Sequence, residues 1–398
     1  MSSTSSISTN SLTPYSTTTD VPKGLNIEIN WDSSVASAPA AFITDVKQVA
    51  DFFASALRPI SSGPITIDVG YGEINGSSLG GSALGESETN LQQVSYYQLT
   101  QAYLAYDTVV GTDLSQNFPS TQPNGKFYVS DAEAQALHII TTTPTVDGFV
   151  GFSSKSNIFD YSTSGTVPSS QYDFVGTVAH EISEVLGRIF LGSKQISAYD
   201  FFHYSSGSNG TPVHDFAANG GGYFSTNGGN TDLANFNMAH GGDGADWAAG
   251  GTSISGGSAF DSFNAFGTLG QFSPVTQTDL TVLQALGFQL SKAAVAGNLT
   301  PFPASTPTTA QTTVLNTQTT ATITSDAFHF GPSGNVAPQT ELDATNLNHT
   351  TQVTEQLASL VTPNAHVDVV LAHLDSITPA DINNAEAPHI VQNHFLLH

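Results

Sequence analysis

The stretch that most constrains this chain runs from residue 172 to residue 190 and reads YDFVGTVAHEISEVLGRIF. Its apolar residues recur every three or four positions, as they do along one face of a helix. They are Phe174, Val178, Ile182, Val185 and Ile189. His180 and Glu184 lie on the opposite side, and because they are four residues apart, their side chains stack on one face. The stretch therefore predicts a core helix with two side chains placed to hold one metal ion.

The central HEISE sequence is a variant of the H-E-x-x-H pattern of zinc proteases, in which two histidines bind the metal and the glutamate deprotonates water. By that pattern, His180 is a metal ligand and Glu181 is the general base. Glu184 stands where the second histidine would be, and a carboxylate is also a competent zinc ligand. Its negative charge makes a bound water less acidic and favours a harder ion, such as manganese or calcium, more than a histidine does.

A histidine beside two glutamates is also common on solvated helix faces that bind no metal. Two observations favour a metal site. The whole chain has only ten glutamates, two of which fall in this stretch, and the residues that flank its polar face are strongly apolar. Because a buried acid requires a partner, such as a metal or a cation, we expect Arg188 to pair with an acid near the site. The alternative for Arg188 is an exposed helix end.

Charge and composition exclude several classes of partner. The 398 residues carry a formal net charge of −25, but only 8 of them are Lys or Arg. Without a basic patch, nucleic acid and anionic membrane surfaces are disfavoured as partners. No apolar run of the required length predicts a membrane span. The chain has no cysteine, so disulfides and thiolate metal sites are excluded.

The sequence divides into four parts. Residues 1–23 form a Ser/Thr-rich leader expected to be disordered, and residues 24–292 are expected to form one domain. A Thr/Pro-rich linker follows at 293–325, and residues 326–398 form an acidic tail without Lys or Arg. This tail ends in HFLLH and resembles C-terminal signals of bacterial one-step (type I) secretion, with a solubilising tail as the alternative. No N-terminal signal peptide precedes it, so export is expected to depend on the tail.

The expected domain alternates strands and helices. Alternating or apolar runs predict strands at residues 25–34, 65–74, 126–130 and 147–154. Helical patterns occur at residues 39–58, 92–106, 131–140 and 277–286. The Gly/Ser-rich stretch 76–90 is expected to be a loop, and residues 193–270 are expected to form a Gly/Asn-rich region of loops. This order predicts a mixed α+β or α/β fold.

HEISEVLGR at residues 180–188 resembles the signature of a family of bacterial secreted zincin-type metalloproteases, which carry His-Glu-Ile-x-Glu-Val-x-Gly-Arg. Further blocks of similarity lie downstream. They are residues 200–207, 223–237, 241–247 and 279–288. The resemblance implies an α+β, metzincin-like mixed sheet with an active-site helix and a Gly/Asn-rich C-terminal subdomain, and it implies peptide-bond hydrolysis with Zn²⁺ as the cofactor. Gly187 stands where the metzincin helix ends.

The third metal ligand is not evident from the helix. The metzincin pattern would place it at Phe190, which cannot bind a metal, so a later residue must supply it. Asp200 is the first choice because the family pattern has an acid there, and His203 is the alternative third ligand. His214 and His240 have no support beyond their chemistry. With Asp200 and Glu184 both bound, the charge of a divalent ion would be neutralised and its Lewis acidity would be weak.

The Gly/Asn-rich loops contain a weaker signal for Ca²⁺. GGDGADWAA matches one copy of a Gly-Gly-x-Gly-x-Asp calcium repeat and offers Asp243 and Asp246 as ligands. Asn230 and Asp232 in STNGGNTDL have the same interpretation. One copy cannot form the stacked helix that the repeat builds, so simple Asp/Gly turns are the favoured interpretation of both segments.

The resemblance and the helix pattern together predict an exported zinc-dependent endopeptidase that acts on a protein or peptide substrate. One alternative is a zincin-fold protein without catalysis that binds a metal or a partner. Another alternative is a calcium-dependent surface or adhesion protein, based on the acidic loops. The sequence does not define the oligomeric state or the cleavage preference.

Overall fold

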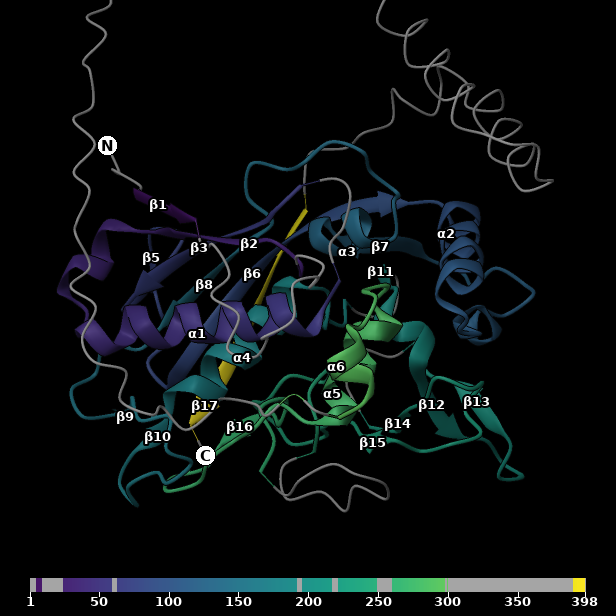
Figure 1. Cartoon of the computed structure of the whole chain (residues 1–398). Coiled ribbons are helices and arrows are strands. Elements are labelled where there is room, and N and C mark those ends of the chain that lie inside the picture. Colours follow the sequence, from purple (N-terminus) through teal and green to yellow (C-terminus); the bar gives the residue numbers. More distant parts are fainter. Residues whose placement is uncertain are drawn as a thin grey trace, which may run out of the picture. The chain divides into compact units, whose positions relative to one another are not determined.

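The computed structural model describes residues 5–8, 24–58, 63–191, 195–216, 221–248, 260–297, 299 and 389–397 (Figure 1). All of these residues belong to one compact unit. The remainder of the expected leader, linker and tail lies outside the described residues. Within the described part, no helix is long and apolar enough to cross a membrane.

A mixed nine-stranded sheet forms the centre of this unit, with the strand order β1-β2-β3-β8-β6-β17-β16 and with β7 and β11 branching from β6. Its strands are β1 (Ser5–Ser8), β2 (Ile27–Trp31), β3 (Ile65–Tyr71), β6 (Ala83–Val94), β7 (Lys126–Ser130), β8 (Gly148–Phe152), β11 (Gln195–Ser197), β16 (Phe266–Gly267) and β17 (His389–Leu397). Strands β2, β3 and β8 are parallel, whereas β6 runs antiparallel to β8. The predicted α+β class with a mixed sheet is confirmed.

Helices α1 (Ala40–Ala56) and α4 (Phe174–Val185) contact each other and the central strands (Figure 1). Helix α1 contacts β2, and α4 contacts β6 and β8. The apolar face of α4 is fully buried, as its periodicity predicts: Phe174, Val178 and Ile182 are each 0% exposed. The remaining helices are α2 (Tyr96–Val110), α3 (Asp131–Ala136), α5 (Gln277–Ala285), α6 (Lys292–Val295) and the short 3₁₀ turns η1 (Ser33–Ser37), η2 (Leu114–Asn117) and η3 (Tyr199–Phe202).

The Gly/Asn-rich region contains a small antiparallel sheet of order β13-β12-β14-β15. Its strands are β12 (His203–Ser206), β13 (Pro212–His214), β14 (Tyr223–Phe224) and β15 (Ala234–Asn235). Two-stranded pairs complete the described strands: β4 (Glu73–Ile74) with β5 (Ser77–Ser78), and β9 (Phe159–Asp160) with β10 (Tyr172–Asp173). An aromatic cluster connects the small sheet to the end of α4, because the Phe190 ring packs against Tyr199, His203 and Phe236. The region is therefore more ordered than the predicted loops.

Most predicted elements are present with small shifts at their ends, but three predictions were wrong. Residues 389–397 were expected to belong to a tail outside the domain, and they form β17, which pairs with β6 in the central sheet. Residues 76–90 were expected to be a loop, and they contain β5 and most of the twelve-residue strand β6. Four residues of the leader form β1, which pairs antiparallel with β2. Strand β6 lacks the usual apolar alternation because Glu86, Ser87 and Thr89 are buried polar residues.

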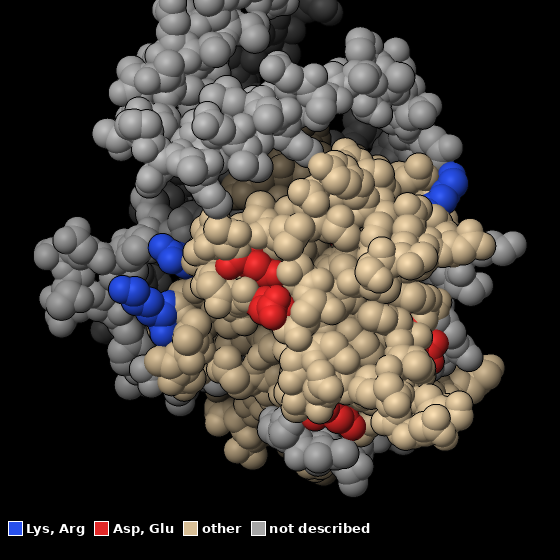
Figure 2. All heavy atoms as spheres, turned by 90° about the vertical axis from the view of Figure 1, so that its right-hand side faces the viewer, with Lys and Arg blue, Asp and Glu red and all other residues tan. Residues whose placement is uncertain are grey.

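Charged side chains are sparse on the described surface. Figure 2 shows one face of the molecule on which acidic and basic residues form small separate groups among uncharged ones. This agrees with a charged fraction of 10% in the whole chain. On this face, the described residues form no basic patch of the kind that binds nucleic acid.

A buried acid on α1 makes stability depend on pH. Asp45 is 3% exposed, and burial, with Asp173 and Asp160 nearby, raises its pKa to about 8. In the unfolded chain, the pKa of an aspartate is about 3.9. Between about pH 4 and about pH 8, the folded state therefore keeps a proton that the unfolded state releases. The contribution of Asp45 to the free energy of unfolding falls as the pH rises from about 4 to about 8. We expect Asp45→Asn to raise the free energy of unfolding by about 1–2 kcal/mol at pH 8 and by less at pH 4.5.

Urea unfolding of Asp45→Asn at the two pH values, with the exposed Asp113→Asn as the matched control, measures this effect. Asp113→Asn is expected to change stability little at either pH. A loss of stability in Asp45→Asn at pH 8 would show instead that the fold uses this carboxylate in its charged form.

Candidate metal centre

Helix α4 carries the predicted site residues and is buried. The backbone conformation of Gly187 sets where the helix ends. The helix is shorter than predicted, ending at Val185, with Gly187 at φ 119° just beyond it. A Cβ atom at Gly187 would lie 3.1 Å from Oε2 of Glu133, so both the backbone conformation and the space favour glycine. Gly187 thus lies just past the end of the helix, and the following residue, Arg188, turns back so that its backbone N–H donates to the carbonyl of Ser183 at 3.2 Å.

Three side chains converge to form the candidate metal centre. The Nε2 atom of His180 lies 3.2 Å from Oε1 of Glu184 and 3.5 Å from Oδ1 of Asp246. One ligand atom from each residue lies within 4.8 Å of the other two, and all three residues are 0% exposed. One imidazole nitrogen and two carboxylate oxygens are a donor set that zinc accepts. Among the described residues, this is the one group of three or more His, Asp or Glu side chains so placed.

A hydrogen bond orients the imidazole of His180. Its Nδ1 atom lies 2.8 Å from the carbonyl oxygen of Ser262, to which it can donate. With the proton on Nδ1, the lone pair of Nε2 points to the two carboxylates, as in many metal-bound histidines. Burial lowers the pKa of His180 to about 3, so the ring is neutral at pH 7, the form that binds metal.

Strand β6 positions Glu184 from the opposite side. Ser87 donates a hydrogen bond from Oγ to Oε2 of Glu184 at 2.7 Å, and Thr89 donates to the backbone carbonyl of Glu184 at 3.1 Å. These contacts explain why the inner residues of β6 are polar. They leave Oε1, the other carboxylate oxygen, as the one nearest to His180.

Arg188 supplies a buried positive charge beside the two carboxylates. Its guanidinium donates to Oδ1 of Asp246 through Nη1, and its Nη2 lies 3.4 Å from Oε1 of Glu184. Its Nε donates to Oγ of Ser183 at 2.8 Å, and its Cζ lies 4.5 Å from the ring centre of Phe263. Burial opposes the charge, but the two carboxylates outweigh it and raise the pKa of Arg188 above its ordinary value. The predicted pairing of Arg188 with a nearby acid is confirmed.

Glu181 lies on the same helix, 0% exposed, and close to β6. A Cβ atom at Gly85 would lie 2.5 Å from Oε1 of Glu181, so glycine at this position makes room for the carboxyl group. Neither oxygen of Glu181 accepts a hydrogen bond from the described residues. Burial, together with the charges of Glu184 and Asp246, raises the pKa of Glu181 well above its usual range. A carboxyl group in this environment binds a proton strongly.

The structure corrects the expected third ligand. Asp200 lies outside the His180 group, and its Oδ2 accepts hydrogen bonds from the backbone N and the Oγ of Ser197, at 2.7 and 2.9 Å. The alternative, His203, is also outside the group, because its ring packs on Phe190 and its Nε2 hydrogen-bonds to the carbonyl of Gly221. Asp246, which the sequence suggested only as a calcium ligand, is the third member of the group.

The other predicted residues have separate environments. Asp243 accepts a hydrogen bond from the backbone of Ala245 at 2.9 Å, and Asn230 donates to the carbonyl of Asn227 at 2.6 Å, as residues in turns do. His214 is bonded to the carbonyl of Asn117 at 2.6 Å, and His240 is exposed. Calcium binding by Asp243, Asp246, Asn230 or Asp232 stays a prediction.

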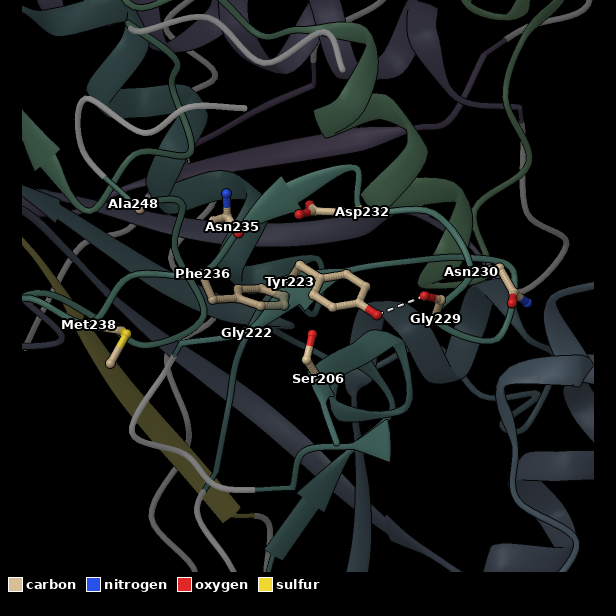
Figure 3. Close-up of a pocket in the computed structure, with 10 residues that line it drawn as sticks. All are labelled: Ser206, Gly222, Tyr223, Gly229, Asn230, Asp232, Asn235, Phe236, Met238 and Ala248. Atoms are coloured by element: carbon tan, nitrogen blue, oxygen red, sulfur yellow. Dashed lines mark hydrogen bonds between the residues drawn. The ribbon is translucent and has the colours of Figure 1, made fainter. Parts of the chain in front are cut away.

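A separate pocket of about 610 Å³ lies on the small sheet. It is lined by residues of β12, β14 and β15 and of the loops beside them, and none of the metal-centre residues contributes to it (Figure 3). The Tyr223 side chain lies across its middle, and its hydroxyl donates to the carbonyl of Gly229 at 2.7 Å (Figure 3). Asp232 is the one carboxylate among the lining residues. Polar and apolar groups line the pocket in about equal parts, and it carries little charge.

Comparison of the chain with family models, with curated proteins and with solved structures finds no match. The functional argument therefore rests on the geometry of the site. That geometry defines a mixed α+β protein with a buried His-Glu-Asp cluster, a paired arginine and an adjacent glutamate.

Proposed function

We propose that this protein is a zinc-dependent endopeptidase of the zincin type, with His180, Glu184 and Asp246 as metal ligands and Glu181 as general base. The observation that carries the proposal is the meeting of three buried ligand atoms within 4.8 Å of one another. Two of them come from one turn of α4, and the third comes from a loop more than 60 residues later in the sequence. The helix, the four-residue spacing of His180 and Glu184, and the position of Glu181 then match the H-E-x-x-H pattern, with Glu184 in place of the second histidine.

The residues present fit a zinc ion in both orientation and charge. Each of the three ligands is held by a second group: Ser262 for His180, Ser87 for Glu184, and Arg188 for Asp246. Arg188 also offsets one of the two carboxylate charges, so the ligand set and the arginine together carry a net charge near −1. A divalent ion would keep part of its positive charge, and when bound it would polarise a carbonyl and lower the pKa of a water molecule.

Glu181 performs the proton transfers in this proposal. Its carboxyl group is one residue from the ligand His180 and lies against Gly85 of β6. It accepts a proton from the attacking water and later gives it to the nitrogen of the cleaved peptide bond. Because Gly85 has no side chain, it leaves the space that this carboxyl group occupies.

A second candidate function is a zincin-like protein without catalysis, in which the cluster has a structural role. The observation in its favour is that His180, Glu181, Glu184 and Asp246 are all 0% exposed, whereas a catalytic site must admit a substrate. In that case the only role of the ion, or of the buried ion pairs, would be to stabilise the fold.

Digestion of casein and of a peptide library by the purified full-length chain tests the function. We expect internal peptide bonds to be cleaved, cleavage to stop with a zinc chelator, and added zinc to restore it. Mass spectrometry of the products distinguishes endopeptidase cleavage from trimming of chain ends. A zinc-loaded chain that cleaves no peptide bond would favour the structural candidate.

We also propose export through the tail, as the sequence predicts.

A further inference from the structure

The C-terminal strand β17 lies along strand β6, beside the candidate metal centre. Residues 389–396 pair antiparallel with residues 83–91 of β6, with a bulge between Phe395 and Leu396. On its other side, β17 pairs in parallel with the short strand β16, and it also contacts α4. Figure 1 shows β17 in yellow next to β6 and α4. Two segments about 300 residues apart in the sequence therefore lie side by side in the sheet.

The register brings β17 to the two residues of β6 that touch the site. Phe395 is paired with Gly85, whose backbone lies against Glu181. Asn393 is paired with Ser87, which donates a hydrogen bond to Glu184. The backbone of β17 is thus paired with the two residues of β6 that contact Glu181 and Glu184. This position is consistent with the complete burial of both glutamates.

Without β17, residues 83–91 of β6 would have an open edge, because β8 and β7 pair with β6 on its other side, along residues 85–89 and 91–94. An open edge offers a row of backbone N–H and C=O groups, and an extended peptide binds such an edge as an added strand. An antiparallel strand at this place is therefore what a bound peptide substrate would look like.

We propose that the β6 edge is a binding site for an extended peptide, and that β17 occupies it as a self-inhibitory segment. The proposal rests on the endopeptidase function for its inhibitory part, and on the strand pairing alone for its binding part. The chain between residue 299 and residue 389 is a long covalent connection, so β17 can leave the edge and return without being lost. A tethered segment has an effective concentration in the millimolar range, enough to keep a weak peptide site occupied most of the time.

Two prolines in β17 test the proposal in the full-length chain. Each proline removes a backbone N–H, and neighbouring N–H groups along a strand point to opposite sides. Gln392→Pro with Asn393→Pro therefore removes one bond to β6 whichever way the strand faces. Gln392→Ala with Asn393→Ala is the matched control, because it keeps both N–H groups. The probe is a fluorescent synthetic peptide of residues 386–398.

We expect the double-proline variant to bind the probe. The wild-type chain and the double-alanine variant should bind it more weakly, by a factor of about ten or more. Cleavage of library peptides should rise in the double-proline variant by a similar factor. Probe binding without any cleavage would support the binding site and count against the endopeptidase. Equal, weak probe binding by all three chains would overturn the proposal.

The double-proline variant could also fail to fold, and a measurement on the wild-type chain covers that outcome. Hydrogen exchange should be faster in residues 389–397 than in β8, because a segment that leaves the edge exchanges by local opening. Exchange in residues 389–397 as slow as in β8 would show that β17 is a permanent strand of the sheet, which would overturn the self-inhibitory role.

Discussion

Replacing Glu181 with glutamine is expected to lower peptide cleavage by about 10²–10⁴-fold, which is the usual contribution of general acid–base catalysis. Glutamine has nearly the same shape, so it fits the space beside Gly85 but cannot accept a proton from water. Because Glu181 is not a metal ligand in this account, the variant should bind as much zinc as the wild-type chain. Initial rates on a fluorogenic peptide, with zinc content measured on the same samples, test both expectations.

Glu133→Gln is the matched control for this substitution. Glu133 is also a buried glutamate, 1% exposed, but it caps α3 by reaching back to the backbone of Ser130. Glutamine performs the same capping role, so cleavage should remain close to the wild-type rate. If Glu181→Gln cleaves as fast as Glu133→Gln, Glu181 is not the general base.

The largest expected effect on stability is that of Arg188→Met. The substitution keeps an apolar side chain over Phe263 but removes the buried cation that pairs with Asp246 and Glu184. Breaking a buried ion pair from one side typically costs about 3–5 kcal/mol, because the remaining charge is uncompensated. We expect a loss of this size in urea unfolding experiments carried out with a chelator.

Arg58→Met is the control, since Arg58 is exposed and its loss should cost little. Zinc should restore part of the stability of Arg188→Met, because a cation at the site again offsets the two carboxylates. An effect of Arg188→Met as small as that of Arg58→Met would contradict the charge balance described for the cluster.

The sequence predicted the helices and inner strands well because their patterns are local. The 3.6-residue period of α4 and the alternation in β2 depend on residues close together in the chain. Strand β6 was missed because its inner face carries Ser87 and Thr89, which bind Glu184, in place of the expected apolar residues. Strand β17 was missed because its partner is about 300 residues away, and no local pattern specifies such a pairing.

The site was likewise predictable only where its residues lie close together in the sequence. His180 and Glu184 follow from one helical turn, whereas the third ligand depends on how a distant loop folds back. The resemblance favoured Asp200, which the structure uses to hold Ser197. A usable signal for Asp246 was its position between Ala245 and Trp247, since an acid between apolar residues is often buried and then requires a partner.

The most direct test of the metal centre is the zinc content of three full-length chains, measured by elemental analysis after purification without chelator. The account predicts about one ion per chain in the wild type and in Asp200→Asn, and a large loss in Asp246→Asn. Asp200→Asn is the matched control, because it changes another buried aspartate of the same subdomain that lies outside the His180 group. A wild-type chain without zinc, or loss of zinc in Asp200→Asn with retention in Asp246→Asn, would contradict the assigned metal centre.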